Sequence, residues 1–114
     1  MKELTAKKYH EMVVQRYINN PYLLNGLKFD IRLYIVITGT NEGLTHAFLA
    51  DEGLVRFCTS EYEKATMANF KKVYMHLANY SINKYSKDFI EDLTVDDIMK
   101  PNKATKRTLK ALYA

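Results

Sequence analysis

The sequence is poor in the residues that build special scaffolds. Of 114 residues only one is cysteine, two are proline, four are glycine and none is tryptophan. Because Cys58 is alone, it cannot form an internal disulfide, which excludes a disulfide scaffold and fits a reducing compartment. Hydrophobic residues make up 47% of the chain, which excludes a disordered tail or a collagen-like repeat. The chain therefore has the size and composition of one globular domain.

Signals for membranes, secretion and several common chemistries are also missing. The longest apolar run, Leu33 to Ile37, is far shorter than the roughly 20 residues of a membrane-spanning helix. The N-terminus has no signal-peptide pattern. His76 has no second histidine at helical spacing, so we expect no zinc site. The four glycines all lie at expected turns, and none belongs to a phosphate-binding loop.

Charge leaves several classes of partner open. The net charge is +4, with 13 acidic residues interleaved among 17 lysines and arginines. Such a balance weakly favours acidic partners, which include nucleic acid, an anionic membrane, a phosphorylated ligand and an acidic protein tail. The nine tyrosines could stack on bases, but the stronger expectation is that they lie on half-buried strands.

The pattern of apolar and turn residues predicts an α+β fold in which an antiparallel sheet is followed by short helices. The clearest strand covers residues 29–38 and is followed by a hairpin loop at 39–43. The other expected extended segments are 44–50 and 54–59, which continue an antiparallel meander, 12–18 as a fourth strand, and a short piece at 22–24. Asn25-Gly26 and residues 51–53 are predicted turns.

The second half of the sequence predicts short helical elements. Residues 62–69 are irregular, and residues 70–77 fit either a helix or an extended segment. The expected helical turns are 88–93, 95–99 with Thr94 as N-cap, and a final helix that begins at Lys106 after a Thr105 cap. Leu109, Leu112 and Tyr113 form one face of that last helix, and the face is unfinished at Ala114. We therefore expect the chain to be truncated at its C-terminus.

Side chains of a strand alternate between its faces, so residues 28–38 present two different surfaces. One surface is expected to be core: Phe29, Ile31, Leu33, Ile35 and Ile37. The opposite surface begins with Lys28, Asp30 and Arg32, where Asp30 can satisfy both cations. Arg56 adds a guanidinium suited to bidentate contact with phosphate or carboxylate. Lys28, Arg32 and Arg56 would form an anion site, and ordinary salt bridges on a solvated face are the alternative.

Three stretches resemble the tubulin–tyrosine ligase-like family, in that family's order and at about its spacing. The first is Val14-Gln15-Arg16-Tyr17-Ile18-x-x-Pro21-Tyr22-Leu23-Leu24-x-Gly26-x-Lys28-Phe29-Asp30-Ile31-Arg32-Leu33-Tyr34. The others are Glu52-Gly53-Leu54-Val55-Arg56-Phe57 and His76-Leu77-x-Asn79-Tyr80-Ser81-Ile82-Asn83-Lys84. Residues 103–113 resemble the following segment of the family more weakly.

The resemblance implies an ATP-grasp-like fold, of which residues 1–114 are the central part. It implies a ligase in which ATP phosphorylates a carboxylate of tubulin and the amine of an amino acid then displaces phosphate. The first stretch is more similar to the glutamate-adding branch, the tubulin polyglutamylases, than to the tyrosine-adding enzyme. Implied partners are tubulin, microtubules and free glutamate, with neither nucleic acid nor membrane. The implied location is the cytoplasm and its microtubules, with the cilium or basal body as a further possibility.

The resemblance also assigns roles position by position. Residues at the adenine border would be Gln15, Arg16, Tyr17 and Ile18. Lys28 and Asp30 match the nucleotide and ribose side. Arg32 and Arg56 match the arginines that hold phosphate and the carboxylates of the amino acid or acceptor, and His76 and Asn79 match a motif beside the phosphates. Positive charge in these positions would stabilise charge that develops on phosphoryl oxygens.

Departures from the family limit what this chain is expected to do alone. Ala78 replaces a usual threonine, so one hydroxyl is missing. The acids that bind Mg²⁺, and the upstream lysines and glycine-rich loop, have no match in this sequence. Without metal ligands the chain alone is expected to be inactive, and its apolar strand face to be poorly covered, so that it is marginally stable or aggregates.

Three alternatives stay open at this point. A tyrosine or glycine ligase is the first. The second is a non-enzymatic basic module that grips acidic tubulin tails. A small nucleic-acid binder is the third, although the basic residues do not gather in a stripe.

Overall fold

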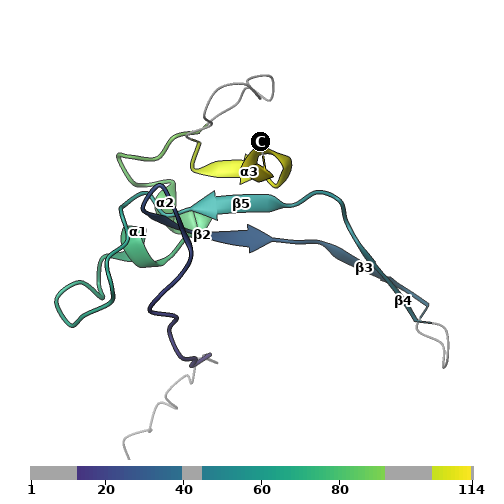
Figure 1. Cartoon of the computed structure of the whole chain (residues 1–114), viewed down its shortest axis with the longest axis horizontal. Helices are drawn as coiled ribbons and strands as arrows, with labels where there is room; N and C mark the ends of the chain where they lie inside the picture. Colours follow the sequence, from purple (N-terminus) through teal and green to yellow (C-terminus); the bar gives the residue numbers. More distant parts are fainter. Residues whose placement is uncertain (1–12, 40–44, 92–103, 114) are drawn as a thin grey trace, which may run out of the picture.

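The computed structural model describes residues 13–39, 45–91 and 104–113, and a small antiparallel sheet organises them. Four strands form this sheet in the order β1 (Leu23–Leu24), β2 (Leu27–Arg32), β5 (Leu54–Phe57) and β6 (Lys106–Thr108). Each strand runs antiparallel to its neighbours. Figure 1 shows β2 and β5 side by side at the centre, with the helices α1 (Val73–His76) and α2 (Tyr80–Asn83) near one end. The antiparallel sheet with short helices that the sequence predicted is confirmed.

The β1–β2 hairpin turns at Asn25-Gly26, as predicted. Both residues have positive φ, 52° for Asn25 and 76° for Gly26. Asparagine and glycine are the residues that tolerate this left-handed conformation, which matches the twist of a two-residue hairpin. The local sequence therefore determines this turn.

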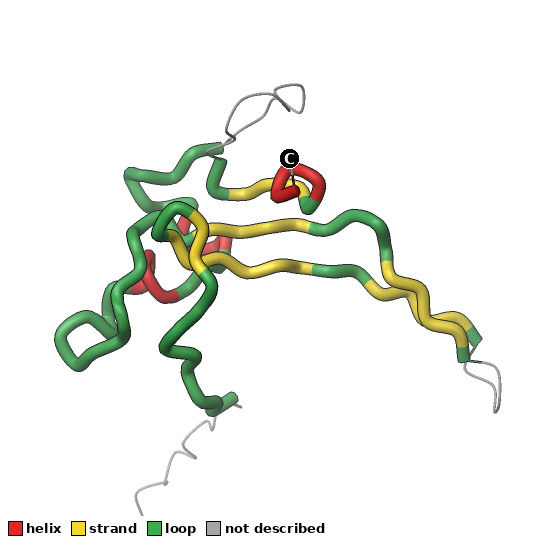
Figure 2. The backbone as a smooth tube through the Cα atoms, viewed as in Figure 1, coloured by secondary structure: helices red, strands yellow, loops and turns green. Residues whose placement is uncertain are grey.

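A second ribbon extends from the sheet and consists of β3 (Ile35–Thr38) and β4 (His46–Leu49). Figure 2 shows the chain running from β2 into β3 and back from β4 into β5, as one long bent hairpin. The predicted meander is wrong, because β5 pairs with β2 and not with β4. At the bend, the Ala50 N–H donates to the Tyr34 carbonyl at 2.9 Å. Gly53 permits the close approach that follows, since a Cβ there would lie 2.7 Å from the Arg32 carbonyl oxygen.

The apolar strand face is not a core beyond its first residue. Phe29 is half-buried, and its ring lies 5.4 Å from that of Phe57 on the opposite strand. By contrast Ile31 is 44% exposed and Ile35 is 65% exposed. The expected core assignment is thus wrong for the residues from Ile31 onward, because the described part of the chain leaves between 44% and 65% of each residue's surface exposed. The expectation that this face is poorly covered is confirmed. The radius of gyration, 19.4 Å, exceeds the roughly 13 Å typical of a compact domain of this length.

Two segments adopt a different structure from the expected one. Residues 13–18 form no strand, because Val13 and Val14 are about nine-tenths exposed and have no ladder partner among the described residues. Residues 106–108 form strand β6 and not the start of a helix. Thr105 does not act as a helix cap, since its carbonyl accepts from Phe57 N–H and its hydroxyl from Ile90 N–H.

Three short helices complete the fold: α1 (Val73–His76), α2 (Tyr80–Asn83) and α3 (Lys110–Tyr113). Thr108 caps α3, where its hydroxyl accepts the Ala111 N–H at 3.2 Å. The predicted helical turn at 88–93 is limited to a turn ending at Asp88, with 89–91 non-helical and 92–93 outside the described residues. The expected segment 95–99, the Thr94 cap and most of the 39–43 loop also lie outside them. The irregular stretch at 62–69 contains no helix or strand, as expected.

The buried core lies where β5 meets the region of α1 and α2 and residues 104–105. Its apolar members are Val55, Phe57, Cys58, Met75, Ala78 and Ala104. Polar side chains are buried beside them, and these are Asn69, His76, Asn83 and Thr105. Within the described parts of the chain, no helix is long and apolar enough to cross a membrane.

Candidate functional site

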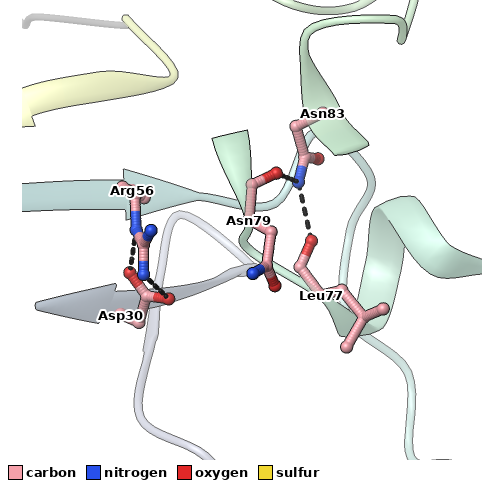
Figure 3. Close-up of polar contacts among 5 residues, drawn as sticks. All are labelled: Asp30, Arg56, Leu77, Asn79 and Asn83. Carbon is pink, nitrogen blue, oxygen red and sulfur yellow. Dashed lines mark hydrogen bonds and ion pairs between the residues drawn. The ribbon is translucent and has the colours of Figure 1, made fainter. Parts of the chain in front are cut away.

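The first element of the site is an ion pair across the central strands. Asp30 and Arg56 lie directly opposite each other in the β2–β5 register, so their side chains share one face. The Arg56 Nε donates to Asp30 Oδ1 at 2.7 Å and the Nη2 to Oδ2 at 2.8 Å. This bidentate hydrogen bonding raises the pKa of Arg56, against an opposing effect of burial. The pair is drawn in Figure 3.

The ion pair corrects the expectation that Asp30 satisfies its sequence neighbours Lys28 and Arg32. Residues two apart on a strand are about 6.6 Å from each other, whereas opposed residues on paired strands are about 5 Å apart. The carboxylate therefore meets Arg56 first. The Arg32 side chain has no hydrogen bond or ion pair among the described residues, and its guanidinium carbon lies 5.5 Å from the centre of the Tyr34 ring.

The second element is a network around Lys28. Its Nζ donates to the His76 carbonyl at 2.7 Å and to the Tyr17 hydroxyl at 3.3 Å. The same ammonium lies 4.6 Å from the centre of the Tyr17 ring. Tyr17, Lys28 and His76, to which the family resemblance gave separate roles, thus form one cluster. Lys28 is consequently engaged by protein acceptors, as Arg56 is by Asp30.

His76 is buried at the centre of this cluster. Its Nε2 lies 3.2 Å from the Asn69 carbonyl and its Nδ1 lies 3.0 Å from the Tyr17 hydroxyl. A carbonyl can only accept, so Nε2 carries a proton, and in the neutral imidazole Nδ1 then accepts from Tyr17 O–H. The Tyr62 ring meets the imidazole edge-on, with 5.9 Å between ring centres. His76 is therefore held in one orientation and one tautomer.

Beside this cluster lies an open cavity of about 500 Å³. Its lining residues are Arg16, Tyr17, Ile18, Asn19, Asn20 and Lys64. The Tyr62 hydroxyl donates to the Asn19 carbonyl at 2.9 Å and so fixes one end of the wall. With Arg16 and Lys64 in its lining, the cavity suits a ligand that has both a flat apolar part and negative charge. Gln15 is exposed and does not line the cavity.

The last element is a pair of asparagines at either end of α2. Asn79 precedes the helix, its side chain is exposed, and it has no side-chain hydrogen bond among the described residues. Asn83 is fully buried and satisfied. Its Nδ2 donates to the carbonyls of Leu77 and Asn79 (Figure 3). Its Oδ1 accepts from Thr59 N–H and Oγ1. Asn83 thus fixes the segment that presents Asn79.

Three members of this arrangement were not predicted from the sequence. Lys64 lines the cavity, Tyr62 holds its wall, and Asn83 locks α2. Only Asn83 carries a local signal, because it follows Asn79 at a spacing that places both on one helical face. Lys64 and Tyr62 lie in an irregular stretch whose position follows from contacts with distant residues.

Two chemistries find no support in the described part of the chain. It contains no group of three or more His, Cys, Asp or Glu side chains that could hold a metal ion. Cys58 is buried, and burial raises the pKa of its thiol to about 11. The thiol is therefore protonated at neutral pH and is a poor nucleophile.

Comparison with known proteins gives consistent matches. A sequence model of the tubulin-tyrosine ligase family matches residues 1–113. "Tubulin polyglutamylase ttll6" of Danio rerio is 44% identical over 81 residues, 71% of this chain and 10% of the relative. "Tubulin polyglutamylase TTLL7" of Homo sapiens is 40% identical over 99 residues, 87% of this chain and 10% of the relative. "Tubulin polyglutamylase TTLL13" of Mus musculus is 38% identical over 108 residues, 95% and 12% of the two chains. The chain thus spans about a tenth of the length of these relatives.

Proposed function

We propose a function from one premise, which is that the chain belongs to the tubulin-tyrosine ligase family. The proposed activity is ATP-dependent addition of glutamate to glutamate side chains in the C-terminal tails of tubulin. The observation that carries it is the similarity to relatives that are named tubulin polyglutamylases, over 71% to 95% of this chain. In this proposal residues 1–114 are the central part of an ATP-grasp domain, and the longer protein works on cytoplasmic or ciliary microtubules.

ATP would supply the phosphoryl group that activates the acceptor carboxylate. In this chain, Gln15, Arg16, Tyr17 and Ile18 are proposed to border the adenine, next to Lys28 and Asp30 on the ribose and phosphate side. Two observations support this assignment. Arg16, Tyr17 and Ile18 line the cavity, and the Lys28 ammonium lies against the Tyr17 ring at the same place. A cationic wall of this kind favours a polyphosphate.

Arg32, Arg56, His76 and Asn79 are the proposed catalytic residues. Arg32 is exposed and has no ion-pair partner among the described residues, so its guanidinium is available to a substrate carboxylate. Arg56 would hold its orientation through Asp30, and a guanidinium held in this way loses little freedom on binding an anion. Asn79 presents an exposed side-chain amide that makes no hydrogen bond among the described residues, and His76 supports Lys28 through its carbonyl.

The described residues do not fit a magnesium site on their own, because no cluster of carboxylates forms among them. As the family resemblance implies, the proposal places the Mg²⁺ ligands outside this chain and expects the 114 residues alone to be inactive. No role in metal binding is assigned to Asp30, whose two oxygens both accept from Arg56.

The test uses the full-length protein that carries this sequence. It is incubated with tubulin, ATP and Mg²⁺, and with glutamate, glycine or tyrosine separately, and the tubulin tails are analysed by mass spectrometry. The expected result is ATP-dependent addition of glutamate alone. Addition of tyrosine or glycine instead would refute the glutamate assignment. Salt-sensitive tubulin binding without any addition would favour the non-enzymatic basic module.

A further inference from the structure

We infer that the hydrogen bond from Tyr17 to His76 positions the nucleotide pocket, so that His76 acts on nucleotide affinity through Tyr17. This inference rests on the proposed function, because it takes the cavity beside Tyr17 as the nucleotide site. In this inference Tyr17 and His76 together hold the wall of the cavity in place. His76 is in this respect a positioning residue.

The cavity wall depends on side chains for its placement. Residues 13–20 belong to no strand, so no backbone ladder holds them among the described residues. Two phenol groups tie this segment to the rest of the chain. Tyr17 O–H donates to His76 Nδ1 at 3.0 Å, and Tyr62 O–H donates to the Asn19 carbonyl at 2.9 Å. The position of Arg16, Tyr17 and Ile18 therefore follows from these contacts.

His76 offers a fixed acceptor for the Tyr17 hydroxyl. The imidazole is 5% exposed, and its Nε2–H is committed to the Asn69 carbonyl. Nδ1 is therefore an acceptor whose direction is set before Tyr17 reaches it. The two successive hydrogen bonds, from His76 to Asn69 and from Tyr17 to His76, connect the α1 region to the cavity wall.

The Tyr17 oxygen has a second partner, the Lys28 ammonium at 3.3 Å. When the hydroxyl proton is donated to His76, the oxygen lone pairs point toward other donors and can accept from Lys28. One hydroxyl thus orients both the aromatic wall and the ammonium proposed to meet the phosphates. Removing it takes one partner from each of them, while Lys28 keeps its hydrogen bond to the His76 carbonyl and its contact with the Tyr17 ring.

The test is ATP binding and steady-state kinetics of the full-length protein with Tyr17→Phe. Loss of one neutral hydrogen bond and of the Lys28 acceptor predicts a rise of about 5-fold to 20-fold in the Kd and KM for ATP. We expect kcat to change less than twofold. Tyr85→Phe is the matched control, because Tyr85 is 73% exposed and its hydroxyl has no partner among the described residues. It should leave both values unchanged.

Two substitutions at His76 separate positioning from general loss of structure. His76→Asn can keep an acceptor near the Nδ1 position, whereas His76→Gln can keep only the donor toward Asn69. The inference predicts that Asn retains most of the ATP affinity and that Gln loses as much as Tyr17→Phe. It also predicts that Tyr17→Phe has no further effect in the Gln background.

The outcomes distinguish this inference from the proposed function. If the wild-type protein does not bind ATP, the proposed function and the inference both fail. If the wild type binds ATP and Tyr17→Phe binds it equally well, only the inference fails. Equal losses in the Asn and Gln variants would also overturn it, since the position of the acceptor would then not matter.

Discussion

Among the residues that we do not expect to contact a substrate, Asn83 is the one whose substitution should disturb the candidate site most. In Asn83→Ala, the Thr59 N–H and the Leu77 carbonyl both lose the Asn83 amide, which they meet at 3.1 Å and 2.6 Å. The Asn79 carbonyl keeps two other donors, the N–H groups of residues 82 and 83. Two part-buried groups without partners cost about 1–3 kcal/mol each, so local opening should become easier by about 2–6 kcal/mol.

Amide hydrogen exchange of the full-length protein measures this directly. Because 1.4 kcal/mol corresponds to a factor of ten, we expect exchange at Thr59 and Lys84 to accelerate at least about 30-fold. Asn79→Ala is the matched control, since that side chain is exposed and has no hydrogen-bond partner among the described residues. It should abolish ligation and leave exchange unchanged. Exchange at Thr59 within threefold of the wild type in Asn83→Ala would refute the argument.

Asn83→Asp gives an independent check with nearly the same side-chain size. It replaces the donor that faces the Leu77 carbonyl with a carboxylate oxygen, which raises the pKa of the new carboxyl in the folded state. The variant should therefore be most stable below the unfolded pKa of about 3.9 and lose stability as pH rises above it. A variant whose stability relative to the wild type does not depend on pH would contradict the hydrogen-bond assignment.

Three further predictions concern other parts of the chain. Burial raises the pKa of Cys58 from 9.0 to about 11, so the native thiol should resist disulfide reagents at pH 8 and react after unfolding; rapid native labelling would contradict this. The same shift implies a stability contribution that is complete below pH 9 and is lost as pH rises through 11. Arg56→Lys cannot reproduce both hydrogen bonds to Asp30. Allowing for the partial exposure of this ion pair, we expect kcat/KM for ligation to fall about fivefold to tenfold. Unchanged kinetics would show that the ion pair has no role in ligation. Phe48→Lys, at a position that is 58% exposed, should reduce aggregation of the isolated chain in sedimentation experiments without lowering its melting temperature; a lower melting temperature would show that Phe48 is packed.

Local chemistry made part of the fold predictable. Asn25-Gly26 gave the first hairpin turn because few other residues tolerate two consecutive positive φ angles. Strand alternation correctly grouped Asp30 with Arg56 on one face. It could not give their pairing, because that depends on the β2–β5 register, and a meander was expected instead.

Other elements depend on partners that sequence patterns do not show. Residues 13–18 contain β-branched and aromatic residues, but strand propensity has no effect without a neighbouring strand to pair with. Residues 106–108 follow a threonine that resembles a helix cap, yet they pair with β5 as an antiparallel strand. Tertiary pairing overrode the local preference in both cases.

The candidate site was predictable as a set of residues but not as a network. Tyr17, Lys28 and His76 were all named from the sequence, yet Tyr17 and His76 are separated by 59 positions. No local sequence pattern indicates that a phenol and an imidazole so far apart in the sequence form a hydrogen bond. The same holds for Asn83 and Thr59, which are 24 positions apart.

The most direct test of the central claim follows one oxygen atom. Tubulin tails are labelled with ¹⁸O in their glutamate carboxylates and incubated with the full-length protein, unlabelled ATP, Mg²⁺ and glutamate. If ATP activates the acceptor carboxylate, each ligation transfers one labelled oxygen from that carboxylate to the released phosphate. We predict one ¹⁸O per phosphate formed by coupled turnover. Glutamate addition accompanied by unlabelled phosphate would contradict the account, because the carboxylate would not have been phosphorylated.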